Sequence, residues 1–213
     1  VGKTTILLQL RHSLSSDKFL PIYFDLQDQA KLRLGEVLAN LADSVESRVN
    51  LSEHKPESFD DEGKYFRSVF LPDLYRVLDK ESRPVFLLDE FDVLDQGDEG
   101  SLENDMASRA LFPLLRQVMD DDIRPAFVFV VGRRTEDLRV DFNQMFKTSL
   151  TKEVWVLDRL SAETLVRQAE VNGTLKFTQQ SVDRILQLTK SHAYLTQLVC
   201  QRLWQRAYTG KPT

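Results

Sequence analysis

Hydrophobic and polar positions along the chain follow two different periods. Short, continuously apolar runs are typical of strands that are buried on both faces of a sheet. These runs cover residues 19–26, 85–88, 126–131 and 154–157. Stretches with helical spacing of apolar residues begin at the GKTT of the N-terminus and recur at residues 31–49, 65–78, 107–119 and 135–146. This alternation predicts an α/β fold with a parallel sheet covered by helices on both faces and built from right-handed βαβ units.

Two details refine this pattern. Pro72 lies inside a helical stretch and predicts a kink there, or a break between two short helices. The apolar residues Phe86, Phe91 and Trp204 are assigned to the core.

From residue 158 onward the pattern indicates helices only. Ser161 is expected to cap a first helix, Thr178 a second, and a third is expected over residues 192–208. We therefore predict two domains, an α/β core over residues 1–157 and a small all-helical lid domain over residues 158–213.

Composition narrows the class of protein. The 213 residues carry a net charge of −5, which argues against a domain dominated by non-specific DNA binding. Apolar runs stay well short of the ~20 residues that a membrane helix needs, so no membrane association is expected. The single cysteine, Cys200, excludes an intramolecular disulfide and fits a reducing, cytoplasmic location. The three histidines are scattered without zinc-ligand spacing, which leaves Mg²⁺ held by oxygen ligands as the expected metal.

The chain opens with VGKTT, which matches the second half of the phosphate-binding pattern G-x-x-x-x-G-K-[ST]. The three residues GKT are weak evidence by themselves, but here they stand where a helix begins. In that setting backbone N–H groups, including that of Gly2, surround phosphates, and Lys3 reaches the β- and γ-phosphates. Thr4 would coordinate Mg²⁺ and Thr5 would touch the α-phosphate. The first glycine of the pattern and a preceding strand are expected before Val1.

Two further motifs end apolar runs. In FLLDE, Asp89 would hold Mg²⁺ through water and Glu90 would orient and polarise the water that attacks the γ-phosphate. The alternative for this pair is a solvated acidic turn after a strand. In FVFVVGRR, Arg133, or Arg134 as second choice, would sense the γ-phosphate. The alternative for these arginines is pairing with surface acids.

Taken together, the motifs resemble those of STAND-type P-loop ATPases, a branch close to the AAA+ proteins of the origin-recognition kind. The resemblance covers nearly the whole chain. It rests on GKTT, VFLLDEFD, FVFVVGRR, LDRLSAETLVRQ and LKFTQQSVDRILQLTKSHAYLTQLVCQRLW. It implies a P-loop NTPase sheet followed by a helical lid.

One segment departs from the family. Its Gly-His-Pro turn, which approaches the nucleotide, is Ser191-His192-Ala193 here. The resemblance implies that His192 contacts the nucleotide, whereas the residues alone favour a position at the start of a helix.

The resulting functional expectation is a switch that binds ATP with Mg²⁺ and hydrolyses it slowly within a larger multidomain signalling or defence protein. The N/T-K-x-D guanine motif is missing from the sequence, which favours adenine. Flanking sensor or effector domains are the expected partners, and self-association into a homo-oligomer stays open. Two alternatives remain: a nucleic-acid-associated ATPase of origin-recognition type, and a nucleotide-binding scaffold without turnover.

Overall fold

A computed structural model describes residues 2–14, 17–51, 54–96, 106–134, 137–138, 146, 149–154 and 156–209. The chain divides into two compact units, which are treated separately below. We call residues Thr4–Thr151 the α/β unit, and Lys152–Thr213, with which residues Val1–Lys3 are grouped, the helical unit. The functional division at residue 158 stays a prediction. The helix expected over residues 135–146 lies largely outside the described residues.

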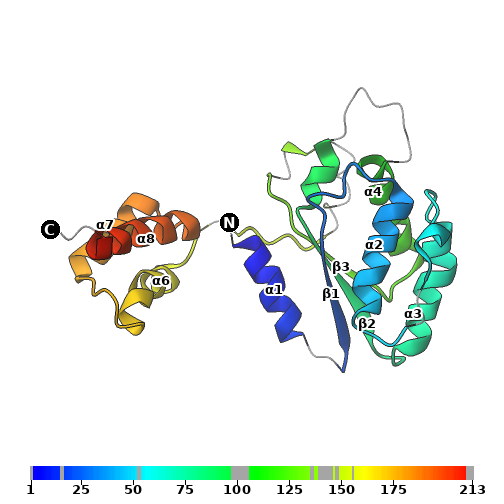
Figure 1. Ribbon diagram of the computed structural model, residues 1–213, viewed down its shortest axis with the longest axis horizontal. Helices are drawn as coiled ribbons and strands as arrows, with labels where there is room; N and C mark the ends of the chain where they lie inside the picture. The colour runs from blue at the N-terminus through cyan, green and yellow to red at the C-terminus, as the bar shows by residue number, and fades with distance from the viewer. Residues whose placement is uncertain are drawn as a thin grey trace. The chain divides into compact units, whose positions relative to one another are not determined.

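The α/β unit is built on a three-stranded parallel sheet in the order β1-β2-β3 (Figure 1). The strands are β1 (Phe19–Asp25), β2 (Arg83–Asp89) and β3 (Ala126–Phe129). They coincide with three of the apolar runs, and the predicted α/β class with a parallel sheet is confirmed. Because β2 lies between two neighbours and is covered on both faces, it consists almost entirely of buried residues.

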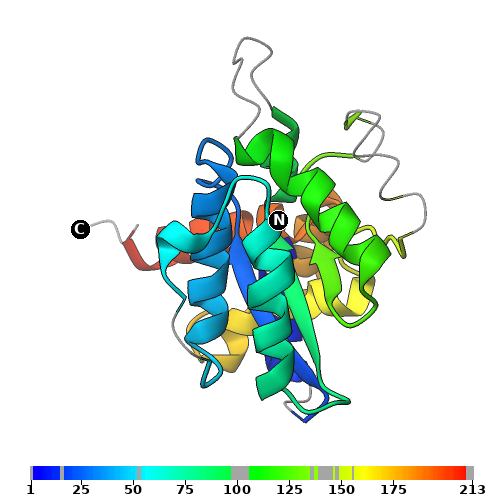
Figure 2. The same cartoon turned by 90° about the vertical axis from the view of Figure 1, so that its right-hand side faces the viewer.

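Helices cover both faces of this sheet (Figures 1 and 2). Successive side chains of a strand point to opposite faces, so β2 supplies both cores. On one face, Val85 and Leu87 pack with Leu7 of α1 (Lys3–Ser13). On the other, Phe86 and Leu88 belong to a larger core with the buried faces of three more helices. These are α2 (Leu34–Glu46), α3 (Leu71–Val77) and α4 (Ala107–Asp121).

The helix does not break at Pro72; it changes from π-helical to α-helical just before this residue. A π-helical turn, η2 (Phe66–Phe70), runs directly into α3, whose second residue is Pro72. Phe66 and Phe70 of the π-turn are buried and stacked, with ring centroids 5.3 Å apart. A short 3₁₀ turn, η1 (Pro56–Ser58), precedes this segment.

The helical unit contains α6 (Arg159–Val171), α7 (Gln179–Thr189) and α8 (Ala193–Thr209). Thr178 caps α7, accepting the Ser181 N–H at 3.2 Å, as predicted. The predicted cap of α6 was wrong. Asp158 is the N-cap, and Ser161 donates its N–H to the Asp158 carboxylate at 3.0 Å.

Two more sequence predictions fail in this part of the chain. The apolar run at residues 154–157 forms no strand in its described residues; Trp155 is not among them. Trp204 is 39% exposed, so its assignment to the core was wrong, whereas Phe86 and Phe91 are buried as expected. The three helices share a small core, and Leu203 and Trp204 of α8 stay exposed.

We find no helix among the described residues with both the length and the apolar character needed to cross a membrane.

Candidate nucleotide site

The first part of the candidate site is a pair of acids where β1 and β2 end. Asp25 and Asp89 are register partners at the carboxyl ends of these strands, which is the edge of a parallel sheet where ligands bind. Asp89 is only 1% exposed. The Tyr23 hydroxyl donates to its Oδ2 at 3.1 Å, and the Glu90 N–H donates to its Oδ1 at 3.0 Å. Both carboxylate oxygens are therefore held in place.

Tyr23 is a stable donor to this carboxylate. Burial, and then the negative charge of Asp89, raise the pKa of Tyr23 to about 12. The phenol is therefore protonated at neutral pH and keeps the hydrogen bond that orients Asp89. Sequence reasoning did not single out Tyr23, because only the β1–β2 pairing brings it beside Asp89.

Glu90 occupies an uncommon backbone conformation. Its φ is +50°, in the left-handed region that residues with a Cβ seldom adopt. Val130 donates its N–H to the Leu88 carbonyl at 2.8 Å and accepts the Phe91 N–H at 2.8 Å. In a regular parallel ladder the second bond would come from residue 90, so one extra residue is inserted here. Such a bulge re-aims a side chain, and bulges are frequent beside active sites.

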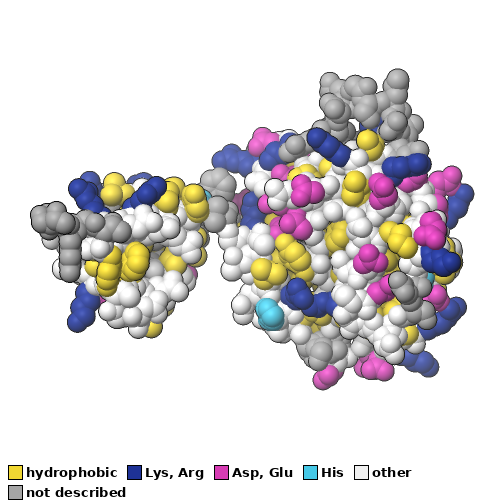
Figure 3. All heavy atoms as spheres, in the orientation of Figure 1, with side chains coloured by type: hydrophobic (Ala, Val, Ile, Leu, Met, Phe, Trp, Pro, Cys, Tyr) yellow, Lys and Arg dark blue, Asp and Glu magenta, His cyan; other side chains and the backbone are white. Residues whose placement is uncertain are grey.

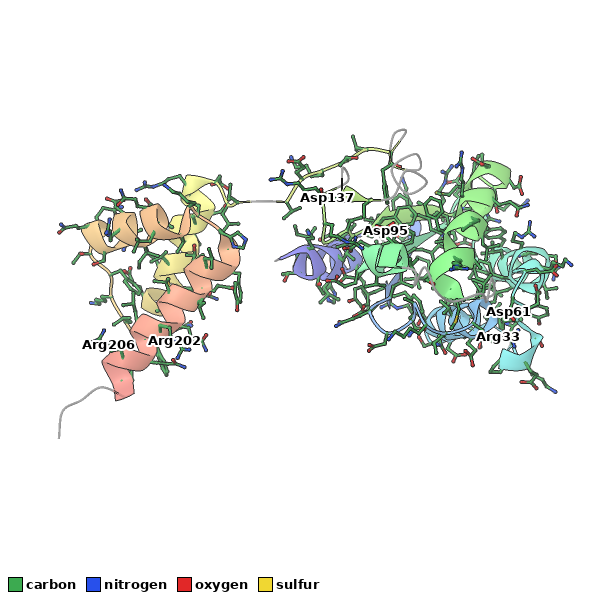
Figure 4. All side chains as sticks on the ribbon, turned by 90° about the horizontal axis from the view of Figure 1, so that it is seen from above. Arg33, Asp61, Asp95, Asp137, Arg202 and Arg206 are labelled. Carbon is green, nitrogen blue, oxygen red and sulfur yellow. The ribbon has the colours of Figure 1, made fainter. Side chains whose placement is uncertain are left out.

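Arg133 lies beside this bulge but is engaged with acids. It donates through Nη2 to the Asp92 carbonyl at 2.8 Å and pairs through Nε with the Asp92 carboxylate at 3.4 Å. Its Nη1 lies 3.3 Å from the Asp95 carboxylate. Asp92 and Asp95 belong to a 3₁₀ turn, η3 (Phe91–Gln96), and Figure 4 labels Asp95. Arg133 thus pairs with acids, as its alternative interpretation expected, but these acids are buried and not on the surface.

Sequence reasoning missed Asp92 and Asp95 as partners. The available signal was their spacing in DEFDVLD, because acids three positions apart share one face of a 3₁₀ turn.

The GKTT segment opens α1, as predicted. Gly2 has a φ of +89°, which a glycine adopts without strain, and Lys3, Thr4 and Thr5 form the first turn. The C-terminal end of α1 connects through a short segment to the start of β1, so the helix runs back along the sheet (Figure 1). Its N-terminal turn therefore lies toward the edge at which the strands end. The phosphate and Mg²⁺ roles of these residues stay predictions.

His192 lies in the helical unit, directly before α8. Two residues with positive φ, Lys190 and Ser191, form the turn that precedes it. The His192 carbonyl accepts the Thr196 N–H at 2.9 Å, as expected for a residue at the start of a helix. Its Nδ1 is buried and has no hydrogen-bond partner within the described part of the chain. A contact between His192 and a nucleotide stays a prediction.

A groove of about 630 Å³ lies elsewhere on the α/β unit, beside the start of α2 and η1. Its lining includes Arg33 and Asp61, which form an ion pair (Figure 4), but none of the predicted site residues. We therefore give more weight to the arrangement of chemical groups at the strand ends than to this groove. Within the described ranges, no cluster of three or more His, Cys, Asp or Glu side chains is arranged to hold a metal ion.

No protein-family model matches the chain, and no curated protein matches it significantly.

Proposed function

We propose that this chain is the ATPase portion of a regulatory switch of the STAND type, with a P-loop NTPase core that binds Mg·ATP and hydrolyses it slowly. One observation carries the proposal. A buried carboxylate with both oxygens held, Asp89, is followed directly by Glu90 on a strand bulge at the carboxyl end of the central strand. A helix that begins with GKTT has its N-terminal turn toward the same edge.

On the helix side, the proposal assigns phosphate binding to the first turn of α1. The backbone N–H groups at a helix start and the positive end of the helix dipole favour an anion. Gly2 provides the close backbone approach, and Lys3 contacts the β- and γ-phosphates. Thr4 coordinates Mg²⁺ and Thr5 contacts the α-phosphate, which leaves the γ-phosphate to face the strand ends.

On the sheet side, Asp89 holds Mg²⁺ through a water molecule, and Glu90 orients and polarises the attacking water. The oxygen of that water forms a bond to the γ-phosphorus while the bond to the β–γ bridging oxygen breaks, yielding ADP and phosphate. A positioned general base contributes roughly 10²–10⁴-fold to a rate. The helical unit serves as the lid, with His192 toward the nucleotide, and relays the bound state to flanking sensor or effector domains.

A nucleic-acid-associated ATPase is the second candidate, because Lys152–Thr213 carries 9 Lys and Arg against 5 Asp and Glu. Arg202 and Arg206 of α8 contribute to this charge (Figure 4). DNA binding by the full-length protein that weakens steeply with rising salt would favour this candidate over the signalling switch.

The test uses two substitutions in the full-length protein, with matched controls at exposed positions. Lys3→Ala should weaken Mg·ATP binding, measured by calorimetry, by roughly 100-fold or more, because a charge-assisted phosphate contact is lost. Glu90→Gln should keep binding and reduce hydrolysis by about 10²-fold or more. The neighbouring surface residues Lys80 and Glu81 give the controls, Lys80→Ala and Glu81→Gln.

The outcomes separate the hypotheses. Binding of Mg·ATP without hydrolysis by the unaltered protein would support a scaffold without turnover, and turnover that Glu90→Gln leaves unchanged would refute the catalytic role of Glu90. Failure of the unaltered protein to bind Mg·ATP would refute the proposal altogether.

A further inference from the structure

The end of β3 is fastened to the segment that directly follows Glu90. Gly132 donates its N–H to the Asp92 carboxylate at 2.7 Å. Arg133 donates to the backbone carbonyl of Asp92 at 2.8 Å and pairs with its carboxylate. We call this set of contacts between Asp92, Gly132 and Arg133 the strap. It joins two segments that flank the bulge at Glu90.

The acids that meet the strap are buried, whereas Gly132 and Arg133 are exposed. The side chains of Asp92 and Asp95 are only 8% and 2% exposed, and both pair with Arg133. A buried carboxylate is costly unless it is paired and hydrogen-bonded, so these acids require Arg133 where it stands. A Cβ at Gly132 would lie 3.2 Å from the Asp92 carboxylate, a tight contact that would shift this carboxylate by a few tenths of an ångström.

The bulge needs such support. A residue with a Cβ keeps a left-handed backbone only where surrounding contacts hold it. Glu90 lies between Asp89, whose carbonyl accepts the Leu26 N–H at 3.2 Å, and Phe91, whose N–H is bound by Val130. The residue before Glu90 is therefore held by the segment that follows β1, and the residue after Glu90 is held by the segment that follows β3. The strap adds further contacts between this second segment and the residues after Glu90.

We infer that Asp92 and Arg133 are positioning residues that hold the Glu90 carboxylate in its catalytic direction. Arg133 then acts by holding the backbone of the bulge in place, and not by contacting the γ-phosphate. The inference rests on the proposed ATPase function. It differs from the role of Arg133 that the sequence suggested. To sense the γ-phosphate, Arg133 would have to break its pairs with two buried carboxylates and bind the nucleotide instead.

The experiment compares Arg133→Gln, Asp92→Asn and the double variant in the full-length protein. For each we measure the dissociation constant for Mg·ATP and for Mg·ADP, and kcat for hydrolysis. Either single substitution should lower kcat by roughly ten- to 100-fold, because small misplacements of a catalytic group carry losses of that order. Both dissociation constants should change less than about three-fold, since a positioning residue makes no ground-state contact with the nucleotide. The kcat of the double variant should be no lower than that of the less active single variant, because the two residues act as one unit.

Further variants guard against a simple loss of folding. Gly132→Ala leaves both charges intact but displaces the Asp92 carboxylate, so it should lower kcat in the same way. Arg133→Lys keeps a cation and should restore part of the lost kcat. Arg76→Gln, at an exposed arginine paired with Asp73 on α3, is the matched control and should leave kcat unchanged.

Two results would overturn the inference. The first is a loss of discrimination between ATP and ADP in Arg133→Gln that Asp92→Asn does not share, which would make Arg133 a phosphate sensor. The second is full activity of both single variants. Failure of the proposed function is recognised separately, because the unaltered protein would then not bind or hydrolyse ATP before any substitution is made.

Discussion

The two units of this protein carry net charges of opposite sign. Residues Thr4–Thr151 contain 18 Lys and Arg against 28 Asp and Glu, a net charge of −10. Residues Lys152–Thr213 contain 9 against 5, a net charge of +4. On the face shown in Figure 3, acidic side chains are spread over the α/β unit, whereas Lys, Arg and hydrophobic side chains dominate the helical unit. The modest overall charge of −5 hides this asymmetry.

Burial separates the units in the same way. Among the described residues, the α/β unit buries four ionisable side chains, His54, Asp89, Asp92 and Asp95. In the described part of the helical unit, the buried polar residues are Thr189 and Thr196, whose hydroxyls bond each other at 2.9 Å. Burying an ionisable group is costly unless fixed partners surround it, and the larger core of the α/β unit provides such partners. Among the described residues, the buried ionisable groups, which are suited to chemistry, therefore lie in the α/β unit.

The largest expected effect concerns the two cores. Phe70 is fully buried, stacks on Phe66 and makes an edge contact with His54. Phe70→Ala should lower the free energy of unfolding of the α/β unit by about 3–5 kcal/mol. Ile185→Ala in the small helical core should cost about 2 kcal/mol, because few side chains surround it.

Hydrogen exchange resolved along the chain measures both effects. Phe70→Leu is the conservative control and should cost less than about 1.5 kcal/mol. Equal loss of protection in both units after Phe70→Ala would mean that they unfold together, and the comparison of separate cores would fail.

Alkaline pH should weaken the α/β unit next. The pKa of Tyr23 is raised from 10 to about 12, chiefly by burial. The unfolded chain therefore releases this proton first, and the stability that neutral Tyr23 contributes is complete below pH 10 and lost between pH 10 and about 12. The denaturant midpoint of the α/β unit should fall over this pH range. In Tyr23→Phe, the midpoint should fall less steeply with pH.

Tyr75 provides a second check on this pH dependence. Burial and its hydrogen bond to Asp122, at 2.6 Å, also raise its pKa. Tyr75→Phe should therefore remove a further part of the slope. An unchanged slope in both variants would show that burial of these phenols does not govern alkaline stability.

A smaller effect is expected at the cap of α7. Thr178→Ala removes the oxygen that accepts the Ser181 N–H and should cost the helical unit about 1 kcal/mol. Thr178→Ser keeps an accepting oxygen and should restore most of the loss. Circular dichroism during urea unfolding gives the measurement, and an equal loss in the Ser variant would argue against capping as the cause.

The smallest effect is expected at the surface of the helical unit. Arg159 pairs with Glu163 at 2.8 Å and also contacts Asp183, but it is exposed to solvent. Such pairs contribute little because water and salt screen them. Arg159→Gln should leave the unfolding midpoint unchanged within error. A clear drop that disappears at high salt would show that surface charge stabilises this unit more than its core suggests.

The sequence predicted the α/β unit better than the helical one, and the reason is physical. A strand buried on both faces needs continuous apolar residues, so the apolar residues 85–88 predicted β2 directly. Helical spacing shows which side of a helix is apolar, but not whether a partner covers it. Trp204 was expected in the core, yet it is 39% exposed.

Short-range capping shows a similar limit. Asp158 and Ser161 both carry a side-chain oxygen that can accept a backbone N–H, and they stand three residues apart at the start of one helix. The structure places Asp158 at the cap, and Ser161 donates its N–H to it. The sequence could therefore indicate that the helix is capped, but the choice between the two oxygens depended on where its first turn closes.

By itself the sequence determined the order of elements and the positions of the chemical groups, because burial of apolar runs and the onset of helices depend on neighbouring residues. Lys3 at a helix start and Asp89 and Glu90 at a strand end were readable in this way. Only the tertiary structure decided the left-handed backbone of Glu90, the hydrogen bond from Tyr23 and the pairing of Arg133. Asp92 and Arg133 are 41 residues apart in the chain, and no local pattern specifies such a contact until the strands pair.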